Sequence, residues 1–222
     1  VTDFTPDESV ISRLPDSCRL VYWDYYHDSK DFYRDMIRGH RWLGSEPIVA
    51  SGVWTWSKLW HDERITRAHA GPCVEACIEE GIQDFFVTMW GDDGAYCDFD
   101  SAFSGLAFVA QKAYTSDGDE ADIAARFEHL TGWPHEANIT AGTLELESIR
   151  AASLLWDDPL LGLFMRALDS ENPEALTAQA ERFRRIADAL DGPAKRCEPL
   201  ELPQLYARFL SGKCQLVTTL GK

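Results

Sequence analysis

The stretch FFVTMWGDDG, residues 85–94, decides the fold that this sequence predicts. It is an apolar run that stops in a tryptophan, two carboxylates and a glycine. Two earlier stretches are built alike, RLVYWDYY at residues 19–26 and IVASGVWTW at residues 48–56. Continuous apolar runs of this length predict strands that are covered on both faces. Strands that all end in aromatic and polar side chains are typical of the carboxyl ends of barrel strands, where binding groups collect.

Helices are predicted between these strands, so the first 114 residues alternate strand and helix. The predicted strands are residues 19–24, 48–54 and 84–90, and the predicted helices are residues 29–42, 62–81 and 99–114. Ser29 is the expected N-cap of the first helix, and Gly44 is its stop. Pro72 is expected to break the second helix, because proline favours the first turn of a new one.

The spacing of the strands favours three successive units of a (β/α)₈ barrel, in which about 250 residues divide among eight units. A doubly wound parallel sheet would give similar spacing. Its nucleotide-binding version usually has a glycine-rich loop after the first strand, whereas residues 25–28 contain no glycine. The predicted fold class is therefore α/β for residues 1–114, as the last three βα units of a TIM barrel, followed by an all-α part.

The second half of the chain has only helical patterns. The polar cluster at residues 115–119 is a turn signal and the expected domain boundary, so that residues 115–222 form an α-helical C-terminal domain. One helix is expected to open at Asn172-Pro173 and to end at residues 191–193. Its core face is expected at positions three and four residues apart, which are Leu176, Ala180, Phe183, Ala187 and Leu190.

The charge of the chain limits its partners. The formal net charge is −16 over 222 residues, which argues against nucleic acid or an anionic membrane surface, since both need a basic face. No segment has the ~20 consecutive apolar residues that span a bilayer. The acidic, polar start at residues 2–8 predicts no secretion signal. We expect no nucleic acid and no membrane as partners.

The six cysteines follow no disulfide spacing. Cys73 and Cys77 lie four residues apart on one apolar helix face and are expected to be buried thiols. A reducing compartment, the cytoplasm, follows as the expected location. The histidines at positions 27, 40, 61 and 69 show no ligand-like grouping, so we expect neither a metal site nor another cofactor.

Half of the eight tryptophans lie at the predicted strand ends, at Trp23, Trp54, Trp56 and Trp90. Any one of them could simply cap a barrel core. Alternate residues of a strand share a face, so Trp54 and Trp56 can point to one side, as can Trp23 and Tyr25. Such rings bury the apolar face of a sugar while polar groups at the rim bind its hydroxyls.

Carboxylates follow two of the strands closely. Asp24 comes at the end of the first strand, and Asp92 and Asp93 come after the third. Carboxylates accept hydrogen bonds from sugar hydroxyls and can act as acid, base or orienting groups. The structural alternative is that Asp24 caps a loop and that Asp92-Asp93-Gly94 is a turn.

These residues match a family. Residues 86–94 resemble the last barrel strand of the family-twenty glycoside hydrolases, the β-N-acetylhexosaminidases. The chain is most similar to a bacterial subgroup of exo-acting β-N-acetylglucosaminidases with a helical C-terminal domain. Residues 22–26 and 51–56 resemble the two preceding strands, and LLWDDPLLGLF at residues 154–164 resembles a recurrent stretch of that helical domain. The resemblance implies a substrate with a terminal, β-linked N-acetylglucosamine.

The resemblance also implies roles for individual residues. A tyrosine next to the tryptophan of the second-last strand holds the acetamido group in many members, whereas this sequence has Thr55. Many relatives also have glutamate at the acidic position of the last strand. The implied pocket walls are Trp90 and Trp54, the implied hydroxyl acceptors are Asp92 and Asp24, and the candidates by location for the acetamido group are Tyr25 and Trp56.

The catalytic residues of the family have no match here. The family cleaves by substrate assistance, in which the acetamido oxygen attacks and an Asp-Glu pair on the fourth barrel strand orients it and protonates the leaving oxygen. Asp62-Glu63 is an adjacent pair, but it begins a helix after the wrong strand. The chain is therefore expected to supply binding residues and no catalytic ones, and to be inactive alone.

Three barrel strands by themselves leave two open sheet edges, so we expect self-association through these edges. Two other functions remain open. The chain could bind sugar without any catalysis on the same scaffold. The aromatic side chains could instead be core, with the helical half as an oligomerisation module.

Overall fold

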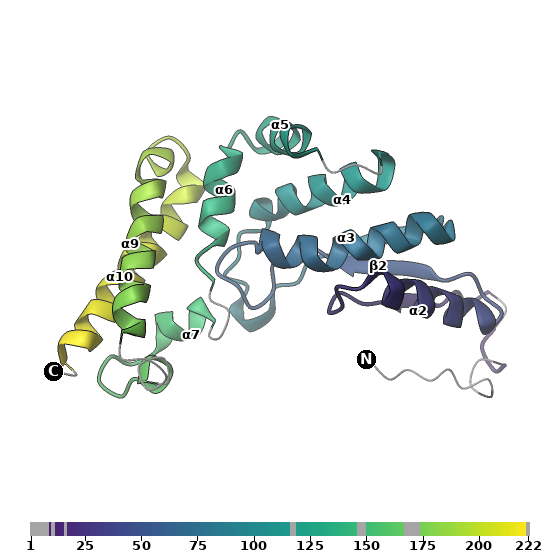
Figure 1. The fold of residues 1–222 in the computed structure, drawn as a ribbon, viewed down its shortest axis with the longest axis horizontal. Coiled ribbons are helices and arrows are strands. Elements are labelled where there is room, and N and C mark those ends of the chain that lie inside the picture. Colours follow the sequence, from purple (N-terminus) through teal and green to yellow (C-terminus); the bar gives the residue numbers. More distant parts are fainter. Residues whose placement is uncertain are drawn as a thin grey trace. The chain divides into compact units, whose positions relative to one another are not determined.

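The computed structural model shows a mostly helical protein with one small parallel sheet (Figure 1). The residues that the structure describes are 9, 12–15, 17–115, 119–145, 150–166 and 174–220. The chain packs as two compact units. The sheet unit comprises residues 1–54, 63–89 and 104–123, and the helical unit comprises residues 55–62, 90–103 and 124–222. The predicted boundary after residue 114 stays a prediction; by packing, the sheet unit continues to Ile123.

Three parallel strands form the sheet in the order β1-β2-β3. They are β1 (Val21–Trp23), β2 (Ile48–Gly52) and β3 (Phe85–Thr88), each inside a predicted strand. Tyr22 pairs with Val49, which pairs with Phe85. The strands form where apolar runs allow both pairing and burial, so the α/β character of this half is confirmed.

The first helix, α2 (Lys30–Trp42), begins and ends as the sequence predicts. The side chain of Ser29 accepts a hydrogen bond of 3.3 Å from the amide of Phe32, which satisfies one of the free donors of the first turn. Gly44 follows the helix with φ at +90°, a left-handed conformation that costs glycine little.

The second helix is not broken. Helix α3 (Glu63–Glu80) runs through Pro72, so the expected break is wrong. A proline removes one intrahelical bond and crowds the preceding turn, at a cost of about 3 kcal/mol or more. Burial of the α3 face around Cys73 and Cys77 against the sheet offsets this cost. The expectation that these two thiols are buried is confirmed.

One face of the sheet is covered and the other is partly open. Helices α2 and α3 cover the face that carries the Tyr22–Val49–Phe85 row. On the opposite face, Trp23 is 50% exposed and Phe86 is 44% exposed. The expectation that both faces are covered is therefore wrong for the outer strands β1 and β3, because in the described residues no second layer of helices buries these side chains.

The predicted helix over residues 99–114 begins as a short 3₁₀ turn, η2 (Phe99–Ala102), and continues as α4 (Phe103–Thr115). Helix α4 packs on α3. The guanidinium of Arg67 lies 4.6 Å from the ring centre of Phe108, and Lys112 forms an ion pair of 2.7 Å with Glu75.

From residue 119 onward the described residues form helices and loops only. The helices are α5 (Glu120–Thr131), α6 (His135–Gly142), α7 (Ala151–Trp156), α9 (Ala175–Ala194), the short η3 (Glu198–Leu200) and α10 (Glu201–Leu220). The five predicted core positions of α9 are all buried. The predicted opening at residues 172–173 and the turn at 116–118 lie outside the described residues.

Helix α9 ends later than predicted, because it continues through Pro193 to Ala194. Ala194 is buried and continues the core face one turn beyond Leu190, which offsets the cost of Pro193, so the expected stop at residues 191–193 is wrong. Among the described residues, no helix combines the length and the apolar character that crossing a membrane requires.

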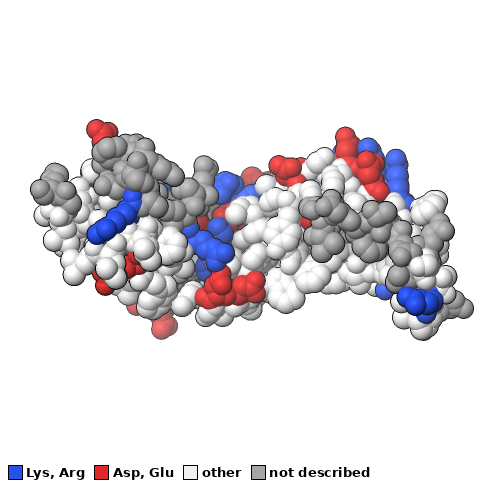
Figure 2. Space-filling view, turned by 90° about the horizontal axis from the view of Figure 1, so that it is seen from below, with Lys and Arg blue, Asp and Glu red and all other residues white. Residues whose placement is uncertain are grey.

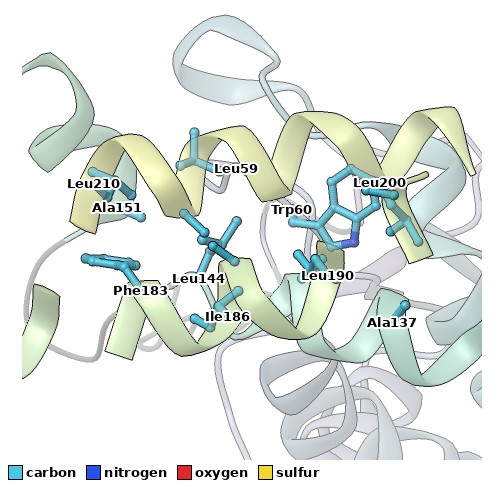
Figure 3. Packing of buried hydrophobic residues seen from close by; sticks show 14 of the residues in the cluster. Leu59, Trp60, Ala137, Leu144, Ala151, Phe183, Ile186, Leu190, Leu200 and Leu210 are labelled. Carbon is cyan, nitrogen blue, oxygen red and sulfur yellow. The ribbon is translucent and has the colours of Figure 1, made fainter. Parts of the chain in front are cut away.

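The core of the helical unit includes a loop from the first half of the chain. Leu59 and Trp60, in the loop after β2, are fully buried among residues of α9 and α10 (Figure 3). The indole nitrogen of Trp60 donates a hydrogen bond of 2.9 Å to the side-chain oxygen of Asn138. This loop is therefore part of the structure of the helical unit and not a free connection.

Candidate functional site

Aromatic rings gather at the carboxyl ends of β1 and β2. The ring centre of Tyr25 lies 5.7 Å from that of Trp23, 4.8 Å from that of Tyr26 and 6.2 Å from that of Trp54. Tyr25 is buried, whereas Trp23 and Tyr26 are at least half exposed. Edge-on contacts of this kind stabilise aromatic clusters. The structure thus brings Trp23, Tyr25 and Trp54 together. Alternation predicted only that Trp23 shares a side with Tyr25, and it paired Trp54 with Trp56, which belongs to the other unit.

Asp24 is held by groups of its own segment. Its carboxylate accepts hydrogen bonds from the hydroxyl of Tyr22 at 3.1 Å and from the amide of Tyr26 at 2.9 Å, and it lies 2.6 Å from Nδ1 of His27. Burial, followed by the nearby charge of Asp24, raises the pKa of Tyr22. Tyr22 therefore stays a neutral donor to the carboxylate.

The sequence analysis missed the Asp24–His27 pair. The His27 ring stacks on Phe32 with centres 3.7 Å apart, and Nδ1 of His69 lies 2.8 Å from the carbonyl oxygen of His27. An imidazole whose Nδ1 is oriented by a carboxylate has its other nitrogen, Nε2, available for proton transfer. In the sequence, the signal for this pair was that Asp24 and His27 lie three residues apart in a loop after a strand. That spacing alone does not show that the two side chains meet.

A second group of predicted residues lies in the helical unit. Trp90 is 38% exposed, and the adjoining 3₁₀ turn η1 (Asp92–Gly94) exposes Asp92. The hydroxyl of Thr55 hydrogen-bonds both the carbonyl and the amide of Trp90. Trp56 is buried, with 5% exposure. The turn that the sequence allowed for residues 92–94 is present.

The six predicted binding residues thus fall into two groups. Asp24, Tyr25 and Trp54 belong to the sheet unit, and Trp56, Trp90 and Asp92 belong to the helical unit. Within the sheet unit, the ring of His69 also lies 5.6 Å from that of Trp54. Each group contains at least one partly exposed tryptophan and one carboxylate, the residue types that sugar binding uses.

The adjacent pair Asp62 and Glu63 has structural partners. Glu63 is buried and accepts hydrogen bonds from Arg67 Nε at 2.6 Å and from Ser104 Oγ at 2.7 Å. In the helical unit, Asp62 lies 3.7 Å from the amine of Lys58. These contacts explain the two carboxylates without a catalytic role.

Figure 2 shows no broad basic surface on the face that it presents, because the visible Lys and Arg side chains lie in separate small groups, several of them beside acidic ones. Among the described residues, no three His, Cys, Asp or Glu side chains come together as metal ligands would. No protein-family model and no curated protein matches this chain.

Proposed function

We propose that this chain is the C-terminal part of a glycoside hydrolase that removes terminal, β-linked N-acetylglucosamine. The observation that carries the proposal is the aromatic cluster around Tyr25 and Trp54, placed beside Asp24 at the carboxyl ends of parallel strands. Ligand sites of parallel α/β folds lie at this end of the strands.

The proposed fold is three successive units of a TIM barrel followed by a helical domain. The parallel order β1-β2-β3, with helices between the strands, supports it. The exposed apolar side chains on the sheet face opposite α2 and α3 support it as well. In a complete barrel, such side chains pack against those of the other strands in the barrel interior.

The binding roles follow from exposure and chemistry. In the sheet unit, Trp54 would offer a wall to the apolar face of a sugar; in the helical unit, Trp90 would offer such a wall and the exposed Asp92 would accept hydroxyls. Asp24 would act through His27, because its own oxygens are already engaged. The buried rings of Tyr25 and Trp56 would support these walls.

Hydrolysis in this proposal is substrate-assisted and needs an Asp-Glu pair that lies outside this chain. The chain alone would bind the sugar and leave the glycosidic bond intact. Six unpaired cysteines, five of them buried, support a reducing, cytoplasmic location for the protein.

The test is a titration with N-acetylglucosamine in which binding is monitored by NMR saturation transfer. N-acetylglucosamine should bind weakly, and Trp54→Ala and Trp90→Ala should each reduce binding. Trp42→Ala is the control, because Trp42 is 69% exposed at the end of α2. A chromogenic N-acetylglucosaminide should not be cleaved. Turnover that Asp62→Asn abolishes would contradict the proposal.

Self-association through the open sheet is part of the proposal. Among the described residues, β1 and β3 each pair with β2 alone, and the side chains of Trp23 and Phe86 are exposed. Phe86→Lys should shift sedimentation toward the monomer. Ile78→Lys, at an equally exposed position on α3, should not. A wild-type chain that sediments as a monomer at all concentrations would refute this part.

A binding protein without catalysis is the second candidate function. The engagement of Glu63 with Arg67 and Ser104 agrees with this candidate as it does with the first proposal, because neither uses this acidic pair for catalysis. It predicts the same sugar binding in a full-length protein that lacks hydrolase activity. The third reading, an oligomerisation module with a purely structural aromatic cluster, predicts self-association without any sugar binding.

A further inference from the structure

A pocket of about 420 Å³ lies within the helical unit. Its lining comes from three segments that are far apart in sequence, and includes Ser57, Asp93 with Tyr96, and Arg150 with Trp156. Pockets that hold small molecules usually have volumes of about 300–1,000 Å³. None of the residues assigned above to the terminal sugar lines this pocket, so it is a separate candidate site.

A carboxylate and a guanidinium form its polar wall. Oδ2 of Asp93 accepts a hydrogen bond of 2.7 Å from the hydroxyl of Ser57 and a charge-assisted bond from Nη1 of Arg150. The Ser57 bond and the Arg150 charge lower the pKa of Asp93, so the carboxylate stays ionised near neutral pH. The two charges balance, which favours an uncharged ligand that both donates and accepts hydrogen bonds.

The backbone of this wall is strained. Among the described residues, the non-glycine positions with positive φ are Ser57 at 58°, Asp93 at 58° and Ala95 at 54°. Two of the three line the pocket, and the third precedes Tyr96. Left-handed backbone in residues with a side chain persists only where the surroundings hold it, and such residues gather at binding sites.

Two aromatic rings form the apolar wall. The ring centres of Tyr96 and Trp156 lie 6.0 Å apart at an angle of 42°, and Trp156 is 68% exposed. Gly94 allows this position of Tyr96, because a Cβ at residue 94 would lie 2.8 Å from the tyrosine ring. A large, exposed, fixed ring beside polar groups suits the apolar face of a sugar.

Two adjacent aspartates fix the remaining wall. The buried carboxylate of Asp157 accepts hydrogen bonds from three successive amides, at residues 163–165, with lengths of 2.9–3.0 Å. Asp158 accepts from the amides of Leu160 and Leu161. Lys213 donates to the carbonyl oxygens of Leu154 and Leu155 just before Trp156. The pocket is therefore formed before any ligand binds.

We propose that this pocket binds a neutral saccharide, with one sugar ring on Trp156 and its hydroxyls on Asp93 and Arg150. Stacking buries the apolar face of the ring, while the paired carboxylate and guanidinium accept from and donate to hydroxyls. An ionic ligand would have to separate the Asp93–Arg150 pair before it gained a partner of opposite charge. The site goes beyond the proposed function and does not depend on catalysis.

The test uses the β-1,4-linked disaccharide of N-acetylglucosamine, titrated calorimetrically into a Trp54→Ala/Trp90→Ala chain, in which the strand-end groups are disabled. We expect binding to persist there. Adding Trp156→Ala should weaken it roughly five- to tenfold, as expected for the loss of an aromatic contact. Adding Trp42→Ala, a tryptophan of equal exposure, should leave it unchanged.

Amide chemical shifts of the unmutated chain give a second readout that needs no variant. On addition of the disaccharide, the amides of Asp93, Arg150 and Ser153 should shift. Three results would overturn the proposal: no binding of the disaccharide, binding that Trp156→Ala leaves unchanged, or a Trp156→Ala variant that changes only the oligomeric state. If sugar binding depends on Trp90 and not on Trp156, the proposed function survives while this site does not.

Discussion

The hydroxyl of Thr55 donates a hydrogen bond of 2.8 Å to the carbonyl oxygen of Trp90 and accepts one of 3.1 Å from the amide of the same residue. One small side chain thus satisfies both backbone groups of Trp90, two residues after the end of β3. These contacts give Thr55 a structural role, because it fixes the backbone from which Trp90 extends.

Replacing Thr55 by valine should remove both hydrogen bonds while keeping the shape of the side chain. We expect a loss of about 1–3 kcal/mol in the free energy of unfolding, measured by denaturant titration, together with a change in tryptophan fluorescence. Thr55→Ser keeps the hydroxyl and should be closer to the wild type. A valine variant as stable as the wild type would show that the two bonds contribute nothing net.

Glu145 should make the stability of the chain depend on pH. Burial raises its pKa above the ordinary value, although its carboxylate accepts bonds from the amides of Leu59 and Ala151 and lies 3.8 Å from Lys58. Nearby Asp62 raises the pKa further. Because the folded pKa exceeds the unfolded one, the contribution of this carboxyl is fully present below the unfolded value and is lost as pH rises through the folded value.

The Glu145→Gln variant, which cannot titrate at this position, tests this. The stability of the wild type relative to the variant should fall as pH is raised from the ordinary carboxyl range to neutrality. Denaturant titrations at successive pH values give this difference, and Glu198→Gln, at an exposed position, serves as the control. A difference that grows with pH would reverse the assigned direction of the shift.

Thiol labelling should separate one cysteine from the other five. Cys18 is exposed, and the rest are buried. Burial raises the pKa of Cys97 to about 12 and that of Cys214 to about 11, so few reactive thiolates form there near neutral pH. We expect Cys18 to react rapidly with one equivalent of a thiol reagent, and the other five cysteines to react only after the protein has unfolded. Cys18→Ser should abolish the fast phase; a second fast equivalent would contradict the burial.

Trp60 should be among the most costly positions to truncate. It is fully buried and hydrogen-bonded to Asn138, so Trp60→Ala should lower the free energy of unfolding by roughly 3–5 kcal/mol. Trp42→Ala, at an exposed position, should change it by less than about 0.5 kcal/mol. Thermal unfolding followed by circular dichroism measures both. Equal melting temperatures would mean that the loop is not part of the core.

A truncation tests the predicted boundary after residue 114. The segment 115–222 contains α9 and α10 but lacks Leu59 and Trp60, which complete their core. We expect this segment alone to unfold without a sharp transition and to bind a hydrophobic dye. A sharp, cooperative transition would support the boundary that the sequence predicts.

Local signals explain what the sequence predicted well. Ser29 and Gly44 set the ends of α2 through hydrogen bonding and backbone conformation within a few residues, and the apolar runs placed all three strands. The buried face of α9 followed from periodicity alone. Such features depend on neighbours in sequence, so they can be read without the fold.

Features that depend on distant segments were missed. Helix α3 continues through Pro72 because its buried face packs on the sheet, which no local rule reports. The burial of Trp60 requires residues more than 70 positions away, such as Asn138. The Asp24–His27 pair and the Asp93–Arg150 pair need loop conformations that the residue types alone do not specify.

The burial of Leu59 and Trp60 in the helical unit determines when this unit can complete its folding during synthesis. Both residues leave the ribosome long before Leu200 and Leu210, with which they share a core. Their side chains stay without that core until the last helix has been made, because contacts of this sequence separation close late. Completion of the helical unit must therefore wait until α10 has been made, and a stall before Leu210 would release a chain with an exposed tryptophan and an unfilled core.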